Sequence, residues 1–183
     1  MDDSVYQKGK LLKDRNIDLL EFGRSNDKVF KVDQLESVID NKNRNLNHVC
    51  TKQNGKFIYT NEQLYQAMGD AKVTIALPRS MTQPEMAGDI ETLTQRYWEC
   101  MFSRMVMVGH APKELIDFIG YNPVIELSDK ISPEELIANV IEHIEDYQVL
   151  VDKNRETAER LGSWDVRMKW LMGELANLYC VMK

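Results

Sequence analysis

The sequence is poor in cysteine and histidine. Its three cysteines, Cys50, Cys100 and Cys180, are widely spaced, and no CxxC pair or Cys/His cluster occurs among its 183 residues. This pattern indicates neither a disulfide framework nor a zinc site, so we predict that the chain holds no metal. Unpaired thiols are typical of a reducing compartment, and we expect a cytoplasmic protein.

The sequence also lacks a long apolar run and a basic cluster. No stretch reaches the roughly 18 apolar residues of a membrane-spanning helix, and the N-terminus, MDDSVYQKGK, has no apolar core of a signal peptide. We therefore expect no membrane span. The net charge is −6. Without a basic stripe, an extended nucleic-acid interface is not expected, although a local basic pocket could still hold one diphosphate.

The length and the apolar content of 43% predict one domain with its own core. We divide the chain into an N-terminal polar segment (1–16), a domain (17–150) and a C-terminal helical extension (151–183).

Strand patterns alternate with helix patterns along this domain. Apolar runs predict strands over 17–22, 73–77, 105–108 and 123–127, with weaker ones between 48 and 59. Helical patterns cover 29–40, 60–69, 91–103, 112–119 and 132–161. The alternation predicts an α/β fold, a Rossmann-like parallel sheet with helices on both faces and right-handed crossovers.

The last helix carries an apolar seam. Its members follow one another at steps of four and three, and they are Trp164, Met168, Leu171, Leu175, Leu178 and Met182. We expect this helix to dock on the domain's own sheet. The alternative is that its apolar seam docks on the surface of a partner. With the ten methionines of the chain, the seam is also compatible with a homodimer.

Two stretches have the pattern of a phosphate or ligand site. The first strand ends at Gly23-Arg24-Ser25-Asn26 and a helix follows, an arrangement that presents backbone N–H groups to a phosphate. Arg24 would grip a diphosphate, or it is an exposed loop arginine. Arg79 ends the strand 73–77, and the loop 80–89 leaves it where α/β sheets bind ligands.

The helix expected over 91–103 carries a polar stripe of Glu91, Gln95 and Glu99. On one helix, the two carboxylates would lie about 12 Å apart, which suits the two ends of an extended ligand. The alternative is a solvated acidic face of an amphipathic helix. Arg96 is either a phosphate or sugar contact or a surface partner of Glu99. His110, at a strand end, is either a loop histidine or a ligand contact.

Glu91 and Glu99, with seven residues between them, are followed by CMFSRMVMV, a helix end, a turn and an apolar strand. This segment resembles the two-glutamate and "EAxAxGxPVV" motifs of bacterial glycosyltransferase-group-1-like proteins, including those akin to spore maturation proteins. The likeness is to their C-terminal, nucleotide-sugar-binding domain, one half of a GT-B fold. It covers about 17–147 and is most specific over 80–127. Arg104 stands where the family has glycine, so the sequence does not predict a positive φ there.

The resemblance implies roles for particular residues. Glu99 would accept hydrogen bonds from the ribose hydroxyls, and Glu91 would lie toward the donor sugar as a catalytic residue. Gly23 and Arg24 would lie near the diphosphate, with Lys28 as a second basic residue.

The resemblance also implies an activity, the transfer of a glycosyl group from a nucleotide diphosphate sugar to an acceptor hydroxyl, without a cofactor or metal ion. A GT-B enzyme has two such domains, so we expect this chain to need an N-terminal acceptor domain or a partner chain. The alternative is a non-catalytic α/β interaction module that uses its C-terminal apolar helix.

Overall fold

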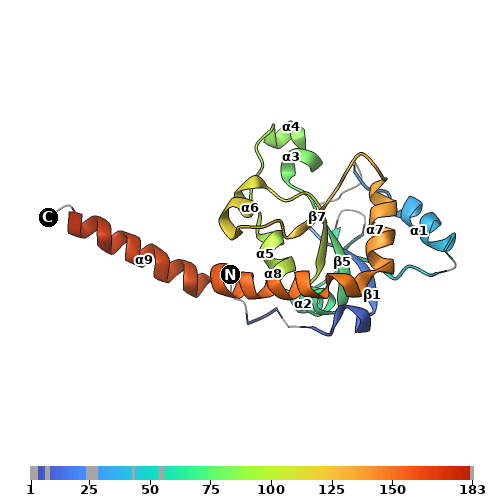
Figure 1. Cartoon of the computed structure of the whole chain (residues 1–183), viewed down its shortest axis with the longest axis horizontal. Helices are drawn as coiled ribbons and strands as arrows, with labels where there is room; N and C mark the ends of the chain where they lie inside the picture. Colours follow the sequence, from blue (N-terminus) through green and yellow to red (C-terminus); the bar gives the residue numbers. More distant parts are fainter. Residues whose placement is uncertain (1–3, 7–8, 24–28, 43, 54–55, 182–183) are drawn as a thin grey trace.

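Five parallel strands form the centre of the computed structural model, which describes residues 4–6, 9–23, 29–42, 44–53 and 56–181 (Figure 1). The strands are β1 (Ile17–Glu21), β2 (His48–Cys50), β5 (Ala71–Ala76), β6 (Val106–Gly109) and β7 (Val124–Glu126). Their order across the sheet is β2-β1-β5-β6-β7. Two further strands, β3 (Lys52–Gln53) and β4 (Lys56–Phe57), form a small antiparallel hairpin.

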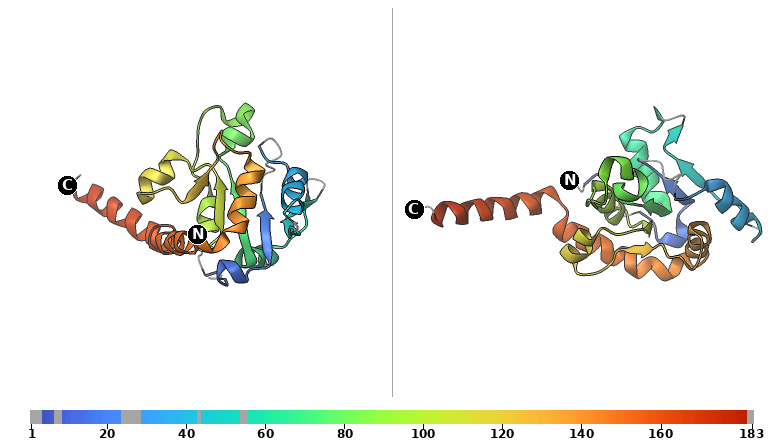
Figure 2. Two further views of the ribbon diagram at one scale, coloured as in Figure 1. Left: turned by 45° about the vertical axis from the view of Figure 1, so that its right-hand side comes forward. Right: turned by 90° about the horizontal axis from the view of Figure 1, so that it is seen from above.

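Helices cover both faces of this sheet, which confirms the predicted α/β class (Figures 1 and 2). On one face lie α1 (Val32–Asp40) and α7 (Pro133–Glu142), and on the other lie α2 (Asn61–Asp70), α5 (Gln95–Phe102) and α6 (Lys113–Ile119). The next helix, α8 (Gln148–Leu161), contacts both layers. Val151 packs in the core between the sheet and the helices α1 and α7, and Ala158 packs in the core on the side of α2, α5 and α6. Short helical turns are η1 (Leu12–Asp14), α3 (Arg79–Thr82), α4 (Pro84–Ala87) and η2 (Ile144–Tyr147).

The central strand β5 shows why the apolar runs become strands. Val73 pairs with Leu19 of β1 on one side and with Val106 of β6 on the other, and all three are fully buried. A strand that is covered on both faces has no exposed side, so its sequence is nearly continuously apolar. The buried hydroxyl of Thr74 is satisfied, since it donates to the Leu20 carbonyl at 2.8 Å.

Two of the helices begin with a reciprocal capping box. Thr60 and Gln63 make a reciprocal capping box at the start of α2, and Ser132 and Glu135 make another at the start of α7. Each box satisfies two backbone N–H groups that have no partner inside their helix.

The prediction that a helix begins at Glu91 is wrong. The helix α5 begins at Gln95, so Glu91 lies in the preceding loop and the two glutamates do not share a helical stripe. The physical reason is that the Glu91 carboxylate is bound elsewhere, to His110 and to the backbone N–H of Lys113. The expected loop 80–89 also differs, because it folds into the single-turn helices α3 and α4.

The turn between α5 and β6 has a positive φ at a residue that is not glycine. Arg104 has φ 55° and is 4% exposed. Its Nε donates to Asp152 Oδ1 of α8 at 2.6 Å. The left-handed conformation costs about 1–2 kcal/mol for a residue with a Cβ, and this ion pair offsets that cost.

The expectation that the last helix docks on the sheet is also wrong. The helix α9 (Trp164–Val181) projects away from the body in each view (Figures 1 and 2). Trp164, Met168 and Leu171 of its apolar seam are 42–59% exposed. The spacing of the seam defines an apolar face, but it does not specify which surface covers that face. Within the described part of the chain, no helix is both long and apolar enough to cross a bilayer.

We expect Arg104→Gly to be more stable than Arg104→Ala by about 1 kcal/mol, because glycine adopts a positive φ without steric strain. Both variants lose the ion pair with Asp152. Arg104→Ala should therefore unfold about 1–3 kcal/mol more easily than the wild type, and Arg104→Gly should lose less, because it also relieves the backbone strain. Urea unfolding at equilibrium measures the three free energies of unfolding.

The matched control is Arg160→Ala, which removes an exposed arginine of α8. Equal stability of the glycine and alanine variants would contradict the role assigned to the positive φ.

Candidate functional site

The topology marks one place on the sheet as a natural binding site. From β1 the chain crosses by α1 to β2 over one face, and the later crossovers lie over the other face. The connections therefore leave β1 and β5 in opposite directions at their carboxyl ends. Ligands of open α/β sheets bind in the crevice at this switch point. Gly23 follows β1 here, and Arg79 follows β5.

Gly23 and Arg96 lie directly against each other at this edge. Gly23 has φ 78°, and a Cβ built on it would lie 2.1 Å from Nη2 of Arg96. The guanidinium also lies over the Phe22 ring, 5.2 Å from its centroid, and Arg96 is 8% exposed. A side chain at this position would push the guanidinium aside, and the positive φ also favours glycine. Arg96 is therefore a buried cation at the switch point, not a surface partner of Glu99.

Glu99 lies one turn further along α5. Its Oε1 accepts hydrogen bonds from the Tyr6 hydroxyl at 3.3 Å and from Gln95 Nε2 at 3.1 Å. Burial raises the pKa of this carboxyl, while the Tyr6 hydrogen bond and the charge of Arg96 lower it, and the net shift is upward. The structure thus brings three predicted residues, Gly23, Arg96 and Glu99, into one group.

Glu91 belongs to a second group, which centres on His110 at the end of β6. The two ring nitrogens of His110 lie 2.8 Å from Glu91 Oε1 and 2.8 Å from Glu126 Oε2. Glu126 Oε1 accepts hydrogen bonds from the Ala111 backbone N–H at 2.9 Å and from Asn122 Nδ2 at 2.8 Å. Through this cluster, the loop before α5 contacts the carboxyl ends of β6 and β7.

The His110 cluster favours a protonated imidazole. Partial burial lowers the pKa of His110, but the hydrogen bonds and negative charges of Glu126 and Glu91 outweigh it, and the net pKa is raised. An imidazolium donates through both nitrogens, which is what two flanking carboxylates require. The carboxylates flank the ring on its two nitrogens instead of converging on one point, and among the described residues no group of His, Cys, Asp and Glu is placed to hold a metal ion.

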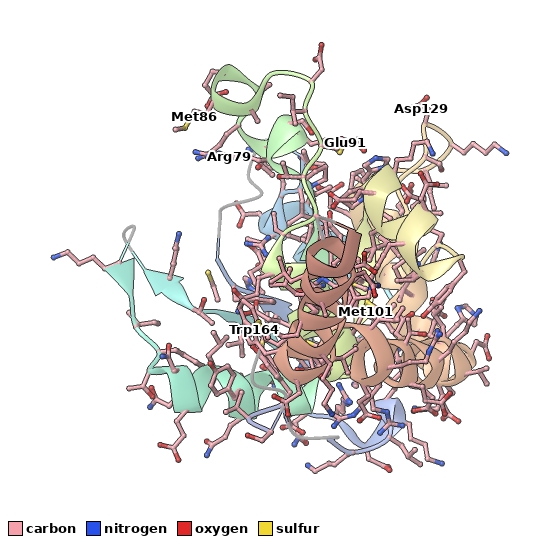
Figure 3. The ribbon with its side chains drawn as sticks, turned by 90° about the vertical axis from the view of Figure 1, so that its left-hand side faces the viewer. Arg79, Met86, Glu91, Met101, Asp129 and Trp164 are labelled. Carbon is pink, nitrogen blue, oxygen red and sulfur yellow. The ribbon has the colours of Figure 1, made fainter. Side chains whose placement is uncertain are left out.

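Arg79 starts α3, and its side chain contacts the neighbouring short helices. Its Nε donates to Gln83 Oε1 at 3.2 Å, and its Nη2 lies 3.1 Å from the Met86 sulfur. Figure 3 shows Arg79 and Met86 together at the end of the molecule where Glu91 also lies. Arg79 thus follows the carboxyl end of β5, and its side chain is directed to Gln83 and Met86. Arg24 and Lys28 lie outside the described residues.

Neither Glu126 nor Tyr6 was singled out from the sequence. For His110 the sequence left two alternatives, a loop histidine or a ligand contact. A glutamate in the apolar strand pattern PVIEL, at the carboxyl end of a parallel strand, was a usable signal for Glu126. Nothing in the sequence pointed to Tyr6, which lies 93 positions from its partner Glu99. No protein-family model matches the chain, and no curated protein matches it.

We expect His110→Gln to lower the free energy of unfolding by an amount on the order of 1 kcal/mol near pH 6 and by less near pH 9. The pKa of His110 is raised in the folded state. The ion pairs therefore contribute stability that is fully present below the unfolded-state pKa of about 6.5. This stability is lost as the pH rises through the folded-state pKa. Urea unfolding at both pH values measures the difference.

His143→Gln, at the exposed end of α7, is the control for a histidine outside the cluster. A difference between wild type and His110→Gln that grows toward high pH would show that the imidazole is not charged in the folded state.

Proposed function

We propose that this chain is the donor-binding domain of a glycosyltransferase, and that it binds a nucleotide diphosphate sugar at the switch point between β1 and β5. The observation that carries the proposal is the group of Gly23, Arg96 and Glu99. It combines a close-approach glycine, a buried guanidinium and a half-buried carboxylate at the edge where α/β sheets bind nucleotides.

Each member of this group suits one part of such a ligand. A guanidinium binds two phosphate oxygens at once, which suits the leaving diphosphate. Because Gly23 has no Cβ, the Arg96 guanidinium can lie directly beside the end of β1, where a phosphate would meet it. The Glu99 carboxylate already accepts hydrogen bonds from a hydroxyl and an amide, so ribose hydroxyls could take their place. Arg79 would reach the nucleotide from the opposite side of the switch point.

In the reaction we propose, the donor sugar would lie toward Glu91. The bond between the anomeric carbon and the diphosphate breaks, and Arg96 stabilises the charge that develops on the leaving phosphate. His110 would hold Glu91 in place through the 2.8 Å hydrogen bond. The acceptor oxygen forms the new bond to the anomeric carbon and gives its proton to a base. An acceptor domain or partner chain would bind the acceptor and supply this base. We place this activity in the bacterial cytoplasm, following the resemblance and the thiol pattern.

A second function is favoured by a different feature, the exposed helix α9. Its large apolar side chains include Trp164 and Trp170, which are 59% and 67% exposed. If the donor site bound no nucleotide, the chain would be an interaction module that acts through this helix.

We expect one of UDP, GDP and ADP, or its sugar conjugate, to stabilise the purified chain against thermal unfolding. A ligand at 100 times its Kd adds about 2.7 kcal/mol to the free energy of unfolding, which is a shift of several degrees. Glu99→Ala should lose most of this shift, because the carboxylate that holds the ribose is gone. Gly23→Ala should lose it too, because its Cβ displaces the Arg96 guanidinium.

Glu156→Ala, which removes an exposed carboxylate of α8, is the control and should keep the full shift. The proposal fails if no nucleotide shifts the melting temperature, or if Glu99→Ala keeps the shift of the wild type.

A further inference from the structure

The helix α9 needs a surface to pack against. Six of its large apolar side chains are 42–67% exposed, namely Trp164, Met168, Trp170, Leu171, Met172 and Leu175. Most helical stability in proteins comes from tertiary packing, and a glycine in the middle of this 18-residue helix costs about 1 kcal/mol relative to alanine. Gly173 is such a residue, with nothing within 4 Å of a Cβ built on it. Packing along the apolar side would supply the missing stability.

Four of these six side chains have the spacing of a coiled-coil seam. They follow one another at steps of four, three and four, and they are Trp164, Met168, Leu171 and Leu175. This alternation is the seam along which two helices pair. One flank of the seam carries Arg167 and Glu174, which are exposed, opposite in charge and seven residues apart.

We propose that α9 pairs with α9 of a second copy of this chain in antiparallel orientation. Met168 of one copy then packs against Leu171 of the other. Trp164 packs against Leu175 in the same way. The flanks that carry Arg167 and Glu174 face each other, so each arginine meets the glutamate of the second copy and the pair gains two ion pairs.

The charges select this orientation over a parallel one. In a parallel pair, the flank with Arg167 faces the opposite flank of the second helix, where the apolar Met172 stands. The guanidinium, which already lies over the Trp98 ring of its own chain, would then lose solvation without gaining an opposite charge. A parallel pair would also bring both bodies to the same end of the helices, whereas the antiparallel pair places them at opposite ends.

The body offers a groove that continues the seam. At the base of α9, a groove of about 590 Å³ is lined by Leu93, Phe118 and Leu161 of the body together with Trp164 and Met168. In the antiparallel pair, Leu175 of the second copy lies opposite Trp164. The turns of that helix after Leu175 therefore run into this groove. Arg167, which lies 4.9 Å from the Trp98 ring centroid, stands at its rim.

Sedimentation of the full chain over a wide concentration range tests the pairing. We expect a reversible dimer. Leu171→Asp should be monomeric, because it places a carboxylate in the centre of the seam. Lys169→Glu is the matched control, since it changes a charge on the outward side of the same helix and should leave the dimer Kd within about twofold.

Charge reversal tests the orientation. Arg167→Glu and Glu174→Arg should each weaken the dimer about tenfold, because each places like charges side by side. The double variant restores both ion pairs with reversed sign and should return the Kd to near the wild-type value.

Three outcomes would overturn the proposal: a wild-type chain that stays monomeric, a dimer that survives Leu171→Asp, or a double variant that remains as weak as the single ones. The result is independent of the donor site, because Leu171→Asp leaves Gly23, Arg96 and Glu99 in place. Its nucleotide-induced thermal shift should therefore equal that of the wild type if the donor site exists.

Discussion

The ion pair between Arg104 and Asp152 fixes the region on which the candidate site depends. It holds the turn after α5 with φ 55° and draws α8 against that turn. Arg155, one turn further along α8, donates to the carbonyls of Phe102 and Tyr6. Tyr6 stacks on the Phe102 ring with centroids 5.7 Å apart, and its hydroxyl reaches Glu99. The position of Glu99 thus follows from how α8 and the N-terminal segment close over α5.

The sheet could be predicted from the sequence because its cause is local. An apolar run such as VTIAL can be buried only where both faces of a strand are covered, and the capping boxes at Thr60 and Ser132 specify helix starts through neighbouring residues. The start of α5 depends on a distant contact instead. The carboxylate of Glu91 is bound by His110, 19 positions away, so periodicity alone placed the helix start too early.

The candidate site also has some residues that local sequence patterns predict and others that depend on distant contacts. Gly23 and Glu99 could be named from a turn and a motif, and the structure brings both to Arg96. The His110 cluster could not be predicted from the sequence, since its three members come from the loop before α5, the end of β6 and the end of β7. The positive φ of Arg104 could not be predicted from the sequence either, because a distant partner, Asp152 on α8, compensates for the absence of glycine. For α9, the seam predicted the helix, but no local pattern states what covers it.

The first turn of α5 links the two groups of the site. Arg96 points to Gly23 at the end of β1, while its neighbour Tyr97 donates its hydroxyl to the His110 carbonyl at 2.7 Å at the end of β6. Successive helical residues point about 100° apart, so one turn contacts two connections. A ligand that binds the Arg96 guanidinium would therefore contact a helix that is also bound to the His110 cluster through Tyr97. Glu91 is held by that cluster, so the two groups keep a constant separation, as the binding of both ends of the proposed donor would require.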